Sequence, residues 1–359
     1  MIWLTWRQFR TQTLVALLTL AAAAIFIAIT HAQLVHLYNA SGIPTCQADG
    51  DCFPARNEFL NHDQLLRTLL GLALLAVPAI IGIFWGAPLV SREIETGTFR
   101  LAWTQSVTRG RWLAAKLIIL GLASMATAGL FSWLVTWWFG RIDGVKLDRL
   151  NPGVFDERGI VAVGYGAFAF ALGVTTGALF RRTVPAMATT LVVFIGTRLV
   201  FTQWVRPHLI GPAHLRFPLN TSSVSGLASH NGGSPKLIVN PPQLEGAWYY
   251  STSIVDKAGH TLTPDFLVQA CSSLMNDLGP GLPGLGKGPT GTGSASPSSG
   301  KAQAFQDCVA KVGEVYHGIA TYQPADRYWL FQGIETAIFI GLAVVLAGFC
   351  FWWIRRGLG

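Results

Sequence analysis

Long apolar runs dominate the chain, and their lengths predict membrane spans. Six stretches reach about 20 mainly apolar residues, the length that an α-helix needs to cross a bilayer. They occupy residues 14–35, 65–90, 117–139, 160–180, 184–205 and 329–354. Only helices and closed barrels span lipid, because every backbone polar group must find a partner within the protein. The pattern therefore predicts an all-α polytopic membrane protein with six transmembrane helices.

The polar stretches between these runs predict three regions. Residues 1–205 hold the first five helices, and residues 329–359 hold the sixth helix with a short tail. Residues 206–328 are too many for a connector and predict a small folded domain. Within that domain, the Gly-, Pro- and Ser-rich residues 278–300 predict a flexible segment, whereas residues 302–316 have an apolar face at helical spacing.

Composition and charge support this class. The chain is 51% hydrophobic and 12% charged, about half the charged share of a soluble domain. Its net charge is +8, but many bases flank the apolar runs, which favours anchoring in a lipid bilayer over nucleic-acid binding. We expect no nucleic-acid partner.

The distribution of Lys and Arg predicts the orientation. The loops on one side of the six spans carry eleven bases, and the short loops on the other side carry five together with four acids. By the positive-inside rule, both termini and the loop of residues 91–116 lie in the cytoplasm. The domain of residues 206–328 is then extracytoplasmic. The first dozen residues mix Trp and Phe with Arg7 and Arg10, which fits an interfacial helix or a basic flank with aromatic anchors.

Four of the five cysteines fall in the predicted outer loops. Cys46 and Cys52 lie in the first of these loops, and Cys271 and Cys308 lie in the last. Such cysteines fit two disulfides in an oxidising compartment, most simply Cys46–Cys52 and Cys271–Cys308. The sequence leaves all three possible pairings open.

Polar and small residues inside the spans predict helix contacts. Arg198 and Glu335 each lie about 10 Å deep, and pairing between neighbouring helices would lower the cost of burying them. Such a pair would be a structural clip at the two ends of the inserted domain, or a substrate contact. In the fourth span, Gly164, Gly166, Gly173 and Gly177 recur at spacings that allow close helix approach.

Motifs of catalytic or metal-binding chemistry are missing from the sequence. It contains no H-E-x-x-H, no paired C-x-x-C and no G-x-S-x-G. The run GLPGLGK at residues 281–287 approaches a phosphate loop, but Gly288 stands where Ser or Thr would bind magnesium. We therefore expect no catalytic residue, no metal site and no cofactor in this chain.

The charged loop of residues 91–116 carries a family resemblance. It reads Arg92-Glu93-x-Glu95-x-Gly97-Thr98, then Ser106-Val107-Thr108-Arg109-x-Arg111, and ends at Lys116. With six spans and a long segment between the last two, this order resembles the ABC-2 type transporter permeases, which are transmembrane subunits of bacterial ABC exporters. The long inserted segment departs from that family, whose members often have only short re-entrant helices there.

The resemblance implies that this loop is a coupling helix that docks on a separate ATPase. Glu93, Glu95 and Arg100 would make charged contacts with the ATPase, and Gly97 with Thr98 would supply a turn and a cap. The implied coupling set is Arg92, Glu93, Glu95, Gly97, Thr98, Arg100, Arg109 and Arg111. The simpler reading of the loop is a solvated, positively charged connection.

The resemblance also implies a function. We expect a permease subunit in a bacterial cytoplasmic membrane, paired with a second copy or a paralogue, that exports a drug-like or lipid-like amphiphile. ATP and magnesium would be held by the partner ATPase. One alternative is a non-transporting scaffold or sensor whose outer domain binds a ligand or partner. Another is a secondary transporter, although the single long loop gives no inverted repeat.

Overall fold

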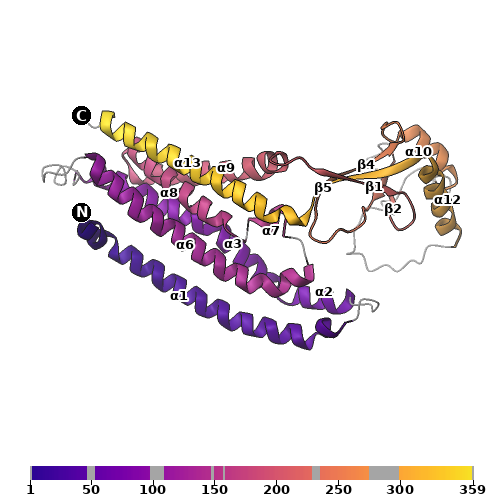
Figure 1. The fold of residues 1–359 in the computed structure, drawn as a ribbon, viewed down its shortest axis with the longest axis horizontal. Helices are drawn as coiled ribbons and strands as arrows, with labels where there is room; N and C mark the ends of the chain where they lie inside the picture. The colour runs from indigo at the N-terminus through magenta and orange to yellow at the C-terminus, as the bar shows by residue number, and fades with distance from the viewer. Residues whose placement is uncertain are drawn as a thin grey trace. The chain divides into compact units, whose positions relative to one another are not determined.

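The computed structural model describes residues 2–46, 53–97, 109–146, 149–156, 158–228, 235–274 and 299–357 (Figure 1). The chain divides into two compact units. Unit 1 comprises Met1–Ile210 and Asp326–Gly359, and unit 2 comprises Gly211–Ala325.

Unit 1 is entirely helical in its described residues. Its helices are α1 (Ile2–Ala40), α2 (Phe53–His62), α3 (Gln64–Ile81), α4 (Ala87–Glu95), α6 (Arg109–Lys146), α7 (Pro152–Phe155), α8 (Val161–Phe180), α9 (Thr183–Val200) and α13 (Tyr328–Gly357). Six helical segments are long and apolar enough to cross a membrane, which confirms the predicted spans. Helix α1 continues without a break from the expected interfacial stretch into the first span. The chain ends N and C lie at the same end of the helical unit (Figure 1).

Two spans contain a π-helical turn. In the second span, η2 (Gly82–Gly86) joins α3 to α4, and the amide of Ala87 donates to the carbonyl of Gly82. In the fifth span, η3 (Phe201–Val205) extends α9, and the amide of Arg206 donates to the carbonyl of Phe201. A turn of this kind inserts one extra residue and rotates everything that follows it. A short 3₁₀ turn, η4 (Arg206–His208), completes the fifth span.

Helix α8 lies at the centre of unit 1. It packs against α3, η2, α4, α6, α9 and α13. Of the residues in its most apolar stretch of 18, 83% are buried. Its backbone meets that of η2 directly: a Cβ atom added to Gly86 would lie 2.6 Å from the carbonyl oxygen of Phe170. A Cβ on Gly173 would collide with Gly82 and Ala87. The predicted glycine face of the fourth span is therefore a close helix contact.

Unit 2 combines strands and helices around its own core. Its main sheet is antiparallel, in the order β1 (Ala213–Pro218), β5 (Tyr316–Gln323), β4 (Trp248–Asp256). A second pair consists of β2 (Val224–Ala228) and β3 (Lys236–Val239). Helices α10 (Pro264–Ala270) and α12 (Ser299–Val315) supply Leu267, Val309 and Val312 to a core shared with Phe217 and Ala320 of the sheet. The predicted helix at residues 302–316 is confirmed as α12, whereas the strands were not predicted.

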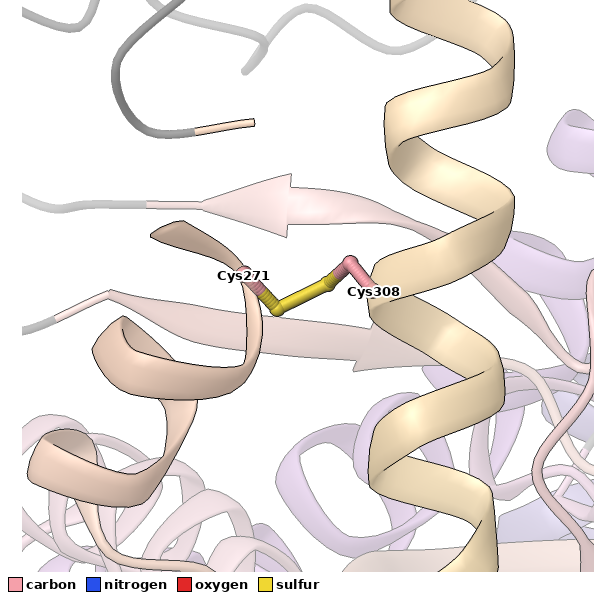
Figure 2. The surroundings of a disulfide bond; sticks show 2 residues. All are labelled: Cys271 and Cys308. Atoms are coloured by element: carbon pink, nitrogen blue, oxygen red, sulfur yellow. A yellow bond between two sulfur atoms is a disulfide. The ribbon is translucent and has the colours of Figure 1, made fainter. Parts of the chain in front are cut away.

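A disulfide crosses this core. It joins Cys271, at the end of α10, to Cys308 in the middle of α12, and Figure 2 shows the bond between the two helices. Both cysteines are fully buried. Cys46 is also disulfide-bonded, but Cys52 lies outside the described residues, so the pair Cys46–Cys52 stays a prediction. Most of the predicted flexible segment, residues 278–300, also lies outside them.

The contact between α8 and η2 predicts a position-specific cost. Gly173→Ala places a methyl group against backbone atoms that cannot move aside, so we expect a loss of about 1–3 kcal/mol in stability. Gly341→Ala in α13 is the matched control, because an added Cβ there meets nothing within 4 Å. Thermal unfolding of the purified protein in detergent measures both. Equal melting temperatures for the two variants would contradict the close contact.

The disulfide predicts the stability of unit 2. The disulfide closes a loop of 37 residues. If it acts by restricting the unfolded chain, the double variant Cys271→Ser/Cys308→Ser should lower the free energy of unfolding by about 4 kcal/mol. Limited proteolysis followed by mass mapping should then show cleavage within unit 2 while the helices of unit 1 stay intact. Cys350→Ala, which changes the buried free cysteine of α13, should leave unit 2 resistant.

Candidate functional site

The last turn of α4 carries Glu93, which pairs with a buried lysine. The ammonium of Lys116, in α6, contacts the Glu93 carboxylate, and the exposed fractions of the two side chains are 3% and 18%. The same ammonium lies 4.5 Å from the ring centre of Trp112, one helical turn earlier. A buried lysine needs such partners because an isolated charge in an apolar interior is costly. The pair therefore joins α4 to α6.

Glu95 joins α4 to a third helix. Its Oε2 atom accepts hydrogen bonds from the hydroxyl of Thr183 at 2.8 Å and from the amide of Thr183 at 3.3 Å. Thr183 is the first residue of α9, where unpaired amides favour a negative charge. The hydroxyl of Ser91, one turn before Glu95, donates to the Thr183 hydroxyl at 3.2 Å. The acids predicted to meet an ATPase therefore bind this chain's own helices.

The other predicted coupling residues lie around the end of α4. Gly97 has φ 72°, which ends the helix, and the hydroxyl of Thr96 donates to the carbonyl of Arg92 at 2.8 Å. Arg92 and Arg111 are exposed. Thr98 and Arg100 lie outside the described residues, and nothing is described of the side chain of Arg109. Of the predicted set, the structure thus places Arg92, Glu93, Glu95 and Gly97 on one helix end.

A second polar cluster lies near the other end of α8. The guanidinium of Arg206 binds the carboxylate of Glu335 through Nε and Nη2, each at 2.9 Å, and also contacts Asp156. Asp156 forms a further ion pair with Arg198 at 2.9 Å. Arg206 and Glu335 are each no more than 1% exposed. We call these four residues, together with Tyr165, the ion cluster.

Tyr165 of α8 occupies the middle of the ion cluster. Its hydroxyl contacts Glu335 and lies 3.1 Å from Asp156, and the guanidinium of Arg198 stacks 3.6 Å from its ring centre. Nearby, Gln332 of α13 accepts a hydrogen bond from the amide of Val161, the first residue of α8, at 2.9 Å. These contacts tie α8, α9 and α13 together.

The ion cluster corrects the predicted pairing of Arg198 with Glu335. The two residues lie in one cluster, but Arg198 binds Asp156 and Glu335 binds Arg206. Sequence reasoning assigned Arg206 to the inserted domain, whereas it lies at the end of a continuous helix in unit 1. In a regular α-helix, eight residues leave two side chains about 80° apart, and seven leave them about 20° apart. Because η3 takes up one residue, Arg198 and Arg206 face the same carboxylate.

The charges of the ion cluster compensate one another. Burial alone would raise the pKa of Asp156, but Arg198 and Arg206 outweigh it and hold that pKa below its usual value. Its stabilising contribution is therefore present above the ordinary carboxyl pKa and is lost as the pH falls through the lower folded value. Two cations and two acids in direct contact favour a structural tie over a substrate contact. Among the described residues, no group of three or more His, Cys, Asp or Glu could hold a metal ion.

Comparisons with known proteins point to one family. The model of the family described as ABC-2 membrane transporter related matches residues 17–206, more than half of the chain. The match runs from the first span to Arg206 and so includes the end of α4 and most of the ion cluster. No curated protein and no solved structure matches significantly.

We predict that removing one charge from the ion cluster destabilises the protein more than removing two opposite charges. Arg206→Met leaves two buried acids with a single cation, and we expect the free energy of unfolding to fall by about 3–5 kcal/mol. Arg206→Met/Glu335→Met removes one charge of each sign and should recover part of that loss. Melting temperatures in detergent measure the difference, with Arg216→Met, at an exposed position of β1, as the matched control. A double variant that is less stable than Arg206→Met would contradict the pairing.

Proposed function

The chain belongs to the ABC-2 membrane transporter related family and is a multi-pass membrane permease of the ABC transporter type, and we propose that a separate ATPase drives it by docking on residues 91–116. The ATPase holds the ATP and magnesium. Two permease chains, identical or paralogous, form the transport path in a bacterial cytoplasmic membrane. The cargo is a drug-like or lipid-like amphiphile, and the direction is export.

The attachment of α4 to its neighbours carries this proposal. Glu93 holds the end of α4 to α6, and Glu95 holds it to the start of α9. Ala87 in the first turn of α4 lies against the backbone of Gly177 in α8. A displacement of the loop that follows α4 therefore moves α4, α6, α8 and α9 together. Rigid-body movement of this kind is one way in which domains switch between states.

This geometry divides the predicted coupling residues into two roles. Glu93 and Glu95 are positioning residues, because their carboxylates bind Lys116 and Thr183. Arg92 is exposed on the same turn and is the residue that we assign to contact with the ATPase. Exposed bases at the helix ends on this side support a cytoplasmic location: Arg92, Arg111, Arg181, Arg182, Arg355 and Arg356. The inserted unit 2, with its disulfide, then lies outside the cytoplasm.

A charge exchange tests the proposal and the role of Glu93 together. The chain is co-expressed with the ABC ATPase encoded nearest to it, and ATPase recovery on the purified permease is measured. Glu93→Lys and Lys116→Glu should each lower the recovery of the ATPase roughly tenfold. That change corresponds to a loss of about 1.4 kcal/mol in binding free energy. The double variant Glu93→Lys/Lys116→Glu restores the pair and should restore most of the recovery.

Two controls separate the outcomes. Arg92→Glu should lower ATPase recovery while the melting temperature of the permease stays unchanged, because its side chain faces solvent. Arg216→Glu in unit 2 should change neither measurement. No ATPase bound to the wild-type chain would contradict the proposed function. Recovery that stays low in the double exchange would instead assign Glu93 to a direct contact with the ATPase.

A further inference from the structure

A large apolar groove lies between the middle of α1 and the second and third spans. Its volume is about 820 Å³, within the range of small-molecule sites. Its walls come from α1, α3, η2 and α6, with Ala23, Ala76, Phe84 and Trp85 among the lining residues. A smaller cavity of about 200 Å³ also touches α1 and shares Trp85 with the groove.

Mainly apolar side chains line the groove, and some of them are fully buried. Ile27, Leu70 and Phe131 line it and also belong to a buried cluster that packs the second half of α1 against α3 and α6. The hydroxyl of Thr19, a polar group in the lining, donates to the carbonyl of Val15 in its own helix. A ligand in this groove therefore meets mainly apolar side chains, together with Thr127 as a second polar residue of the lining.

The dimensions of the groove fit a lipid chain. From Val15 to Ile27 the wall on α1 extends about 18 Å, close to the roughly 15 Å of hydrocarbon in one leaflet. The π turn η2 supplies Phe84 and Trp85 to the wall, and such turns often occur at functional sites. The exposed side chain of Arg10 precedes Leu17, a lining residue of the smaller cavity, by two helical turns. A positive charge thus lies beyond the Val15 end of the groove.

We propose that this groove is a binding site for one acyl chain of a bilayer phospholipid, with the phosphate of that lipid held by Arg10. The groove lies between helices that cross the membrane, so the bilayer itself supplies the ligand at high concentration. The tail contacts the apolar wall, and the anionic head group remains at the interface beside the guanidinium. This site is independent of ATPase docking and is measured on the permease alone.

Photolabelling tests the site. The full chain is reconstituted in vesicles of phosphatidylethanolamine and phosphatidylglycerol that contain a phosphatidylglycerol with a photoreactive acyl chain, and adducts are mapped by mass spectrometry. Adducts are expected on the α1, α3 and η2 peptides that line the groove. Ala23→Trp or Ala76→Trp fills the groove and should lower this labelling about tenfold, as expected when roughly two methylene groups lose their contacts.

Matched variants distinguish a lipid chain in the groove from a second copy of this protein. Ala21→Trp places the same side chain on the face of α1 turned away from the groove and should leave the labelling unchanged. Arg10→Gln should lower it several-fold, and full labelling of this variant would overturn the assignment of the phosphate. Equal labelling of Ala23→Trp and Ala21→Trp would overturn the groove as the site. Dissociation of a dimer by Ala23→Trp, with labelling unchanged, would assign the groove to a second copy of the chain.

Discussion

The close approach of α8 to its neighbours is the constraint on which unit 1 depends. Between helices in lipid there is little hydrophobic driving force, so association depends on tight packing and on hydrogen bonds. Helix α8 meets that requirement through glycines that bring its backbone against η2 and α4. The hydroxyls of Thr176 in α8 and Thr190 in α9 add a hydrogen bond of 2.7 Å. A bulkier α8 would push apart the second, third, fifth and sixth spans, which all pack against it.

This central helix also connects the two polar sites. At one end, Gly177 lies against Ala87, the first residue of α4, whose last turn binds α6 and α9. At the other end, Tyr165 and Val161 contact the residues that join α9 to α13. A single helix thus separates the charged surface at the end of α4, where we propose that the ATPase docks, from a buried ion cluster whose charges balance. The packing of one element makes the two sites parts of the same body.

Local patterns predicted the spans and the glycine face, because length and spacing decide them. They favoured a bond between Cys271 and Cys308 but left the other pairings open. The strands of unit 2 were missed, since many of their side chains are only half-buried and their stability depends on a core assembled from distant segments. Arg206 was missed because helical periodicity ends where a π turn begins, and nothing in the residue types of η3 marks that turn. The partners of Glu93 and Glu95 are long-range contacts, which the charge of the loop alone could not identify. A signal for the ion cluster was present in part: two bases and two acids near span ends on the same side.

The order of the ion cluster along the chain has a consequence for biosynthesis. Glu335 follows Arg206 by 129 residues, whereas Asp156 precedes it by 50. At roughly 5–20 residues per second, a ribosome needs about 6–26 s to make the intervening stretch. During that interval Asp156 is the only acid of the ion cluster that has been synthesised. Arg198 and Arg206 can therefore pair with Asp156 before the last span is made, whereas their cluster gains Glu335 only afterwards.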